Sequence, residues 1–270
     1  MSDNRIFAVW GSPSSGKTVT SIKIALELSF IKKNVIVVLC DTVSPDLIAV
    51  LPNCNTYDKS LGSVLSEALN TQEQILQKSV VLKHNPNISV LGYLHGENVF
   101  TYPQYSKERA VDFLILLSHL ADYVIVDCSS VFTSDILSTV ALEMADQVLR
   151  LGRANLKSIS YFESYLPVLA DRRFNTNKHI KILSNVKNNE AHEKVKEVFG
   201  GVSSIIPYTE EIEEQYLSGE LFHQLKSKGS NQYKQIIKLL VSSLIEKDTT
   251  NTKKPNIFES FISRMGGKKM

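Results

Sequence analysis

The sequence predicts an α/β fold in which a mostly parallel β-sheet of about seven to eight strands is flanked by helices. Short apolar runs alternate with longer amphipathic stretches, and this alternation is typical of a parallel sheet wrapped by helices. Several of the short runs are apolar at consecutive positions, as expected of strands that are covered on both faces. The chain has 270 residues, of which 43% are hydrophobic and 21% charged, so its composition indicates an ordinary globular protein.

The strands are predicted at residues 5–10, 34–40, 88–94, 123–127, 147–151, 180–183 and 203–206. The helices are predicted at residues 17–31, 61–69, 107–120, 133–144, 156–169, 191–199 and 231–246. After residue 246 the chain becomes polar (KDTTNTKKPN), which indicates a linker. We therefore expect one domain at 1–246, a linker at 247–256 and a separate tail at 257–270.

Charge, cysteine content and hydropathy limit the class of protein. A net charge of +2 gives no strong indication of nucleic-acid binding. The three cysteines lack metal-ligand spacing, which favours a reduced cytosolic setting. No apolar run approaches the roughly 18 residues of a membrane span, and Gly11 and Pro13 come too early for a signal peptide. We expect a soluble, cytoplasmic protein.

The motif that carries chemistry is GSPSSGKT at residues 11–18, which fits G-x-x-x-x-G-K-[ST] at every fixed position. It follows a predicted strand and opens a predicted helix, which is the context in which this loop binds nucleotide phosphates. Lys17 is expected to reach the β- and γ-phosphates, and the Thr18 hydroxyl to bind Mg²⁺. A chance strand–turn–helix connection is the alternative. The predicted nucleotide-binding residues of the loop are Gly11, Ser12, Ser14, Ser15, Gly16, Lys17, Thr18 and Val19.

Two aspartates end predicted strands and should lie at the same edge of the sheet as this loop. Asp127 closes the run Asp122-Tyr123-Val124-Ile125-Val126, where it could hold the Mg²⁺ shell. Asp41 follows the second strand and could orient the attacking water. The alternatives are a helix cap for Asp127 and a simple turn former for Asp41. Lys17, Asp41 and Asp127 are therefore the predicted catalytic residues.

The sequence favours adenine over guanine. After Asp127 the chain reads Cys128-Ser129-Ser130, without the glycine of the GTPase motif Asp-x-x-Gly. The late strand ends Ser184-Asn185-Val186-Lys187-Asn188, which differs from the guanine-reading motif Asn-Lys-x-Asp. The predicted cofactors are ATP and Mg²⁺.

Over residues 4–245 these features together resemble the MinD/ParA family of P-loop ATPases, including the MinD-like proteins of pilus, flagellar and secretion systems. Met144-Ala145-Asp146-Gln147-Val148 is similar to the family's Ala-Asp-x-Val segment. The resemblance implies a P-loop NTPase of Rossmann-like architecture, in which Asp41 and Asp127 are the switch aspartates. It places Asn185 and the Pro207 segment (Ile206-Pro207-Tyr208) beside the adenine.

One position departs from the family pattern. Most members read Gly-Lys-Gly-Gly-x-Gly-Lys-Thr, and the early lysine contacts the nucleotide of a partner subunit in a dimer. Here that position is Ser12, followed by Pro13-Ser14. Serine has no long cationic side chain, and proline removes one N–H donor from the loop. The resemblance therefore implies a homodimer and hydrolysis, whereas Ser12 argues for slow hydrolysis and for a localisation factor.

The leading hypothesis is an ATP-binding protein or slow ATPase that positions other proteins of a larger machine at the membrane. The alternatives are a nearly inactive nucleotide-bound scaffold and a P-loop small-molecule kinase. The tail supports the membrane hypothesis. As a helix it would place five apolar side chains within an arc of about 140°, namely Ile257, Phe258, Phe261, Ile262 and Met265, with Lys253, Lys254, Lys268 and Lys269 flanking them. This layout favours an anionic membrane surface at the inner face of the cell membrane.

Overall fold

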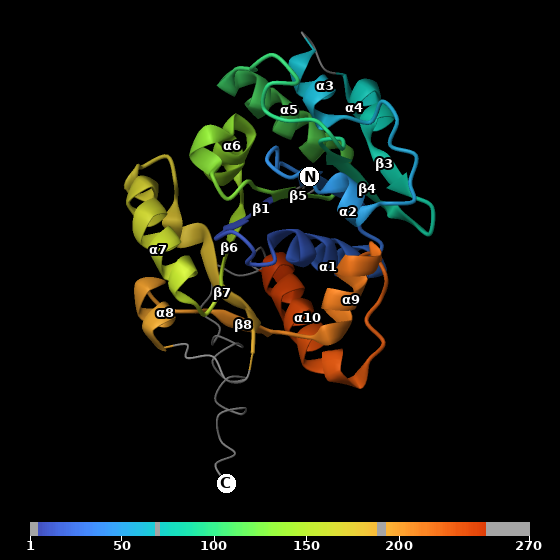
Figure 1. Cartoon of the computed structure of the whole chain (residues 1–270). Helices are drawn as coiled ribbons and strands as arrows, with labels where there is room; N and C mark the ends of the chain where they lie inside the picture. The colour runs from blue at the N-terminus through green and yellow to red at the C-terminus, as the bar shows by residue number, and fades with distance from the viewer. Residues whose placement is uncertain (1–4, 68–70, 188–192, 247–270) are drawn as a thin grey trace.

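A single eight-stranded sheet runs through the computed structural model, which describes residues 5–67, 71–187 and 193–246 (Figure 1). The strands lie in the order β3-β4-β2-β5-β1-β6-β7-β8, and every neighbouring pair is parallel except β3 and β4. Their bounds are β1 (Arg5–Gly11), β2 (Val35–Leu39), β3 (Val80–Leu82), β4 (Asn85–Gly92), β5 (Tyr123–Asp127), β6 (Gln147–Gly152), β7 (His179–Val186) and β8 (Ser204–Pro207). The predicted fold class is confirmed.

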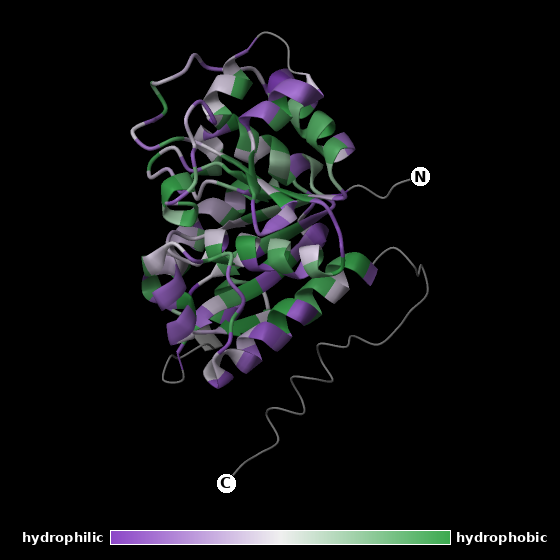
Figure 2. Cartoon of the chain, turned by 90° about the vertical axis from the view of Figure 1, so that its right-hand side faces the viewer, coloured by the Kyte–Doolittle hydropathy of each residue, from purple (hydrophilic) through white to green (hydrophobic). Residues whose placement is uncertain are grey.

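Helices cover both faces of the sheet (Figure 1). One face carries α3 (Leu61–Ser66), α4 (Gln72–Lys78), α5 (Lys107–Leu120), α6 (Ile136–Met144), α7 (Leu156–Tyr165) and α8 (Glu193–Val198). The other carries α1 (Lys17–Phe30), α2 (Leu47–Val50), α9 (Glu210–Ser218) and α10 (Asn231–Glu246). Hydrophobic residues gather along the sheet in the interior, and hydrophilic residues predominate on the outer parts of the helices (Figure 2).

The two faces of the sheet produce two hydrophobic cores. Because successive side chains of a strand point to opposite faces, Val37 of β2 packs into the core beneath α1 and α10, while Val38 packs into the core beneath α5 and α6. Both side chains are fully buried. This double burial explains why the central strands are apolar at consecutive positions.

Most predicted elements are present, with differences at their ends. The helix predicted at 61–69 ends at Ser66, and that predicted at 133–144 begins at Ile136, because Asp135 caps its first turn through Ser138 N. The helix predicted at 156–169 continues after Tyr165 as a 3₁₀ turn that contains Pro167. The structure adds β3, α2, α4 and α9, which the sequence patterns did not predict.

Both edge strands are short and irregular. β3 has three residues and its pairing with β4 shifts register between Val81 and Leu82. β8 has four residues, ends at Pro207, and its pairing with β7 shifts between Leu183 and Val186. Pairing without a register shift is therefore confined to the six inner strands.

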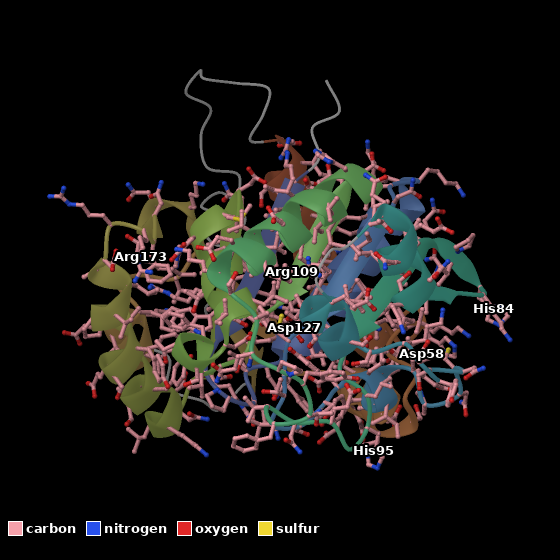
Figure 3. All side chains as sticks on the ribbon, turned by 90° about the horizontal axis from the view of Figure 1, so that it is seen from above. Asp58, His84, His95, Arg109, Asp127 and Arg173 are labelled. Atoms are coloured by element: carbon pink, nitrogen blue, oxygen red, sulfur yellow. The ribbon has the colours of Figure 1, made fainter. Side chains whose placement is uncertain are left out.

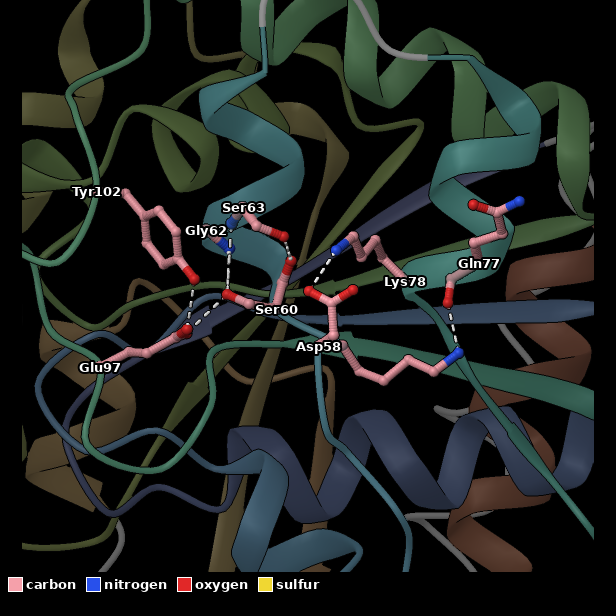
Figure 4. A network of polar contacts seen from close by, with 9 residues as sticks. Asp58, Ser60, Gly62, Ser63, Gln77, Lys78, Glu97 and Tyr102 are labelled. Atoms are coloured by element: carbon pink, nitrogen blue, oxygen red, sulfur yellow. Dashed lines mark hydrogen bonds and ion pairs between the residues drawn. The ribbon is translucent and has the colours of Figure 1, made fainter.

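The loop after β4 is fixed to the start of α3 by a polar network (Figure 4). Glu97 accepts hydrogen bonds from Ser60 Oγ (2.7 Å) and from the Tyr102 hydroxyl (2.7 Å) through its two carboxylate oxygens. Ser60 in turn caps α3 by accepting from Gly62 N at 3.0 Å. This network holds a long loop at the carboxyl edge of the sheet.

Within the described ranges, none of the helices combines the length and apolar character that are needed to cross a bilayer. The predicted linker at 247–256 and tail at 257–270 lie outside the described residues.

Candidate nucleotide-binding site

The carboxyl ends of β1, β2, β6 and β7 surround a cavity of about 490 Å³. Such a position beyond the strand ends is where open α/β sheets bind ligands, and the volume suits a small molecule. Predicted site residues that line it are Ser14, Ser15, Gly16, Lys17, Thr18, Val19, Asp41, Asn185 and Pro207. Gly11, Ser12 and Asp127 are buried and are not among the lining residues.

The loop that joins β1 to α1 turns tightly around this cavity. Ser14 (φ 58°) and Gly16 (φ 78°) both adopt left-handed backbone conformations, and Ser15 N donates to Ser12 O at 3.2 Å. At the start of the loop, Gly11 lies against the backbone of β6, and Ser12 N donates to Leu151 O at 3.1 Å. The first turn of α1 consequently points its N–H groups toward the cavity, which suits an anion.

Thr18 and Asp127 form the centre of the site. Thr18 Oγ1 donates to Asp127 Oδ2 at 2.6 Å. Asp127 is 4% exposed and lies near the middle of the molecule, whereas His84 and His95 lie at its rim (Figure 3). Burial raises the pKa of Asp127 to about 7, and the nearby Lys17 opposes this shift. A carboxylate in an apolar interior is costly without a compensating cation.

The residues at this centre fit a magnesium ion. Asp127 Oδ1 is buried without a hydrogen-bond partner among the described residues, and Mg²⁺ prefers carboxylate, hydroxyl and phosphate oxygens. Within the described residues no group of three or more His, Cys, Asp or Glu side chains could hold a metal alone. Magnesium sites of nucleotide-binding proteins usually need only one or two carboxylates, because phosphates and waters complete them.

Asp46 is a site residue that the sequence patterns did not single out. It lines the cavity and its Oδ2 lies 3.3 Å from Thr18 Oγ1. Burial raises the pKa of Asp46 to about 6, and the charge of Asp41 adds to the shift. Its position at the start of α2 depends on the path of the loop after β2, for which the segment Asp41-Thr42-Val43-Ser44-Pro45-Asp46 gives only a turn signal.

Asp41 lies at the cavity and also forms a turn. Its Oδ1 accepts from Val43 N at 2.8 Å and from Ser44 N at 3.1 Å. These are the contacts of an Asx turn, as the turn-forming alternative predicts, and the catalytic role of Asp41 stays a prediction. The turn directs the loop that carries Asp46 toward Thr18.

Lys17 is held by a residue of the loop after β5. Its Nζ donates to Ser130 Oγ at 2.6 Å. The carbonyl of Ser130 accepts from Trp10 Nε1 at 3.4 Å and from the Tyr161 hydroxyl. The lysine expected to hold phosphate is thus bound to the loop after β5 through Ser130, a contact that no motif indicates.

Residues at the ends of β7 and β8 line the part of the cavity away from Asp41 and Asp46. Asn185 adopts a left-handed conformation (φ 56°), and Ser184 Oγ donates to Ser15 O, so β7 contacts the phosphate loop directly. Pro207 and Tyr208 line the cavity beside Asn185, and Lys187 Nζ lies 4.6 Å from the centre of the Tyr208 ring. The mixture of an amide, a proline and an aromatic ring suits a planar base.

Ser12, at the position that departs from the family pattern, is directed into the protein. It is 2% exposed, and its Oγ lies 3.0 Å from Ser158 Oγ of α7. The Ser158 Oγ also accepts from Arg153 N at 3.0 Å. Ser12 therefore ties the phosphate loop to the loop after β6.

Comparison with solved structures shows which known proteins share this fold. A ParA family ATPase from Chlorobium tepidum has a TM-score of 0.73 at 20% identity, covering 88% of this chain and 99% of that one. The septum site-determining protein MinD from Pyrococcus horikoshii, complexed with Mg-ADP, has a TM-score of 0.69 at 15% identity, covering 93% and 99%. A MinC:MinD cell division complex from Aquifex aeolicus has 0.65 at 17% identity, covering 92% and 98%. No protein-family model and no curated protein matches the sequence.

The sheet topology and the similar solved structures define the class of fold: this is an α/β fold of the P-loop type, with the phosphate-loop motif directly after β1. More narrowly, the fold is that of the MinD/ParA ATPases, which confirms the resemblance predicted from the sequence.

Proposed function

We propose that this protein binds Mg-ATP and acts as a MinD/ParA-like switch that positions a partner protein of a larger machine. The observation that carries the proposal is the hydrogen bond between Thr18 and Asp127, which lies beside Lys17 at the phosphate loop. The cavity next to this loop also contains residues that suit a planar base. Support for the nucleotide also comes from the Pyrococcus relative, which was solved with Mg-ADP.

Each residue has a distinct part in this proposal. Lys17 leaves Ser130 for the β- and γ-phosphates, while the N–H groups at the start of α1 bind phosphate oxygens. Thr18 and Asp127 hold the magnesium ion, which neutralises charge on the phosphates. Asp41 and Asp46 bring two further carboxylates to the cavity lining, where Asp41 can orient a water for hydrolysis. Asn185 and Pro207 contact the adenine.

Hydrolysis is proposed to be slow. Ser12 is buried against Ser158 and has no long cationic side chain, so it cannot stabilise charge on the nucleotide of a partner subunit. Cationic groups of this kind contribute about 10³-fold or more in related phosphoryl transfer. The same observation favours a second candidate, in which bound nucleotide serves as a structural component and turnover is absent.

Equilibrium titration of the protein with fluorescent Mg-ATP, in competition with unlabelled ATP and GTP, tests nucleotide binding. ATP should compete better than GTP, and Lys17→Ala should abolish binding because it removes the loop's only cation. Lys157→Ala, at an exposed position on α7, is the matched control and should bind as the wild type does. Equal competition by ATP and GTP would reject the adenine assignment.

Turnover separates the two candidates. A slow ATPase should release phosphate at a rate that Asp41→Ala and Asp127→Ala each reduce to background, whereas Asp112→Ala, on the exposed side of α5, should not change it. Binding with no release above the Asp127→Ala background would favour the structural role.

The proposal also includes attachment to an anionic membrane through the tail at 257–270. Its flanking lysines each favour an anionic surface by about 1 kcal/mol, and one short helix binds weakly, so a homodimer or a partner would strengthen attachment by avidity. The full chain should sediment with anionic vesicles in the presence of Mg-ATP, and a chain ending at Asn256 should stay in the supernatant. If both remain in the supernatant, the tail does not bind membranes.

A further inference from the structure

Arg153, immediately after β6, lines the cavity together with Lys17. Leu149 and Leu151 of β6 belong to the core on the α1 side of the sheet. Arg153 follows the last residue of β6, and it lines the same cavity as the phosphate loop on this side of the sheet. Its backbone N–H is fixed by Ser158 Oγ, which also contacts Ser12.

The guanidinium of Arg153 has an unused donor at this position. Its Nε is shielded from solvent and has no hydrogen-bond partner among the described residues. The ion pairs of the described chain do not include Arg153. A buried donor left without a partner costs free energy, so a rearrangement of the side chain that gave this donor a phosphate acceptor would remove an existing penalty.

The charges around the cavity make a second cation necessary for a polyphosphate. Among the described residues of its lining, Lys17 and Arg153 are the cations, and they face the carboxylates Asp41, Asp46 and Glu213. Without Arg153, a nucleotide triphosphate would enter a cavity whose fixed charges are mostly negative. Magnesium would offset part of this repulsion, but the residues that would hold it, Thr18 and Asp127, lie on the β5 side of the loop.

We propose that Arg153, from the loop after β6, binds the terminal phosphates of the nucleotide held by the same chain. The inference rests on the proposed ATP site. Planar guanidinium groups bind phosphate oxygens with two N–H groups at once, so Arg153 completes a clamp in which Lys17 contacts the phosphates from α1 and Arg153 contacts them from the loop after β6.

The test compares nucleotides with different numbers of phosphates. Titrations of the full chain with Mg-ATP, Mg-ADP and AMP should show that Arg153→Ala weakens ATP and ADP binding about tenfold or more and leaves AMP binding unchanged. Arg153→Lys should recover part of the loss because it restores the charge without the bidentate geometry. Arg172→Ala, at an exposed arginine outside the cavity lining, is the matched control.

The outcomes distinguish this inference from the proposed function. If Arg153→Ala binds ATP as tightly as the wild type while Lys17→Ala loses it, the ATP site stands and the Arg153 clamp is overturned. An equal loss for ATP and AMP would assign Arg153 to the base, the ribose or the loop structure, and would also overturn it. Thermal unfolding without nucleotide should occur at no lower temperature for Arg153→Ala than for the wild type, because the substitution also removes the unpartnered buried donor. No ATP binding by the wild type would reject both proposals.

Discussion

Gly11, the last residue of β1, lies in direct contact with the backbone of β6. A Cβ atom there would lie 1.8 Å from Leu151 O, so alanine must push apart two central strands. Gly11→Ala should lower the free energy of unfolding by about 3 kcal/mol or more, as measured by urea denaturation. Gly96→Ala is the control, because its φ is +85° but nothing lies within 4 Å of the added atom. Only backbone strain of about 1–2 kcal/mol is expected there, and equal effects of the two changes would argue against the close contact.

His179, at the start of β7, should make stability sensitive to acid. Burial lowers its pKa to about 4, and the charges of Arg150 and Lys181 add to the effect. The unfolded chain takes up a proton near pH 6.5 while the folded chain does not until about pH 4, so the free energy of unfolding falls as pH drops through this range. His179→Phe should flatten this fall by up to about 3 kcal/mol. The measurement is urea unfolding at pH 7 and pH 4.5, with His84→Phe at the rim as control. If the two variants follow the same pH profile, His179 is not the acid-sensitive group.

Among the loops, the segment after β4 depends on one carboxylate. Glu97 accepts from Ser60, Tyr102 and Leu94 N, so Glu97→Ala leaves several donors without an acceptor. We expect a loss of about 1–3 kcal/mol in unfolding free energy and faster amide exchange in this loop. Glu163→Ala, at an exposed position on α7, should change neither, and a similar result for Glu97→Ala would show that packing alone holds the loop.

At the level of elements, sequence reasoning succeeded where a pattern is local and long. The buried inner strands and α5 and α10 were predicted because their apolar spacing extends over many residues. The strand β3 was missed because three residues give no period. The helix α4 carried a usable signal, since Thr71 and Gln74 form a capping box. In the site, the contiguous phosphate loop was predicted, whereas Asp46, Ser130 and Arg153 reach it only through the packing of separate loops.

For the molecule as a whole, the two cores share the strands between them and should unfold together. Val37→Ala and Val38→Ala remove the same group from adjacent, fully buried positions on opposite faces of β2. Each should cost about 1–3 kcal/mol, and each should shift the unfolding transition equally by circular dichroism and by the fluorescence of Trp10, which lies in the Val38 core. If Val37→Ala left the unfolding transition measured by Trp10 fluorescence unchanged, the cores on the two faces of the sheet would unfold separately.

The short, irregular edge strands have a consequence for association. An extended edge invites pairing with a strand of another chain and can begin aggregation, whereas brief, register-shifted or proline-containing edges discourage it. Here three residues at β3 and four at β8, the latter closed by Pro207, offer few consecutive backbone donors and acceptors. The described sheet is thus protected at both ends against growth by edge-to-edge strand pairing.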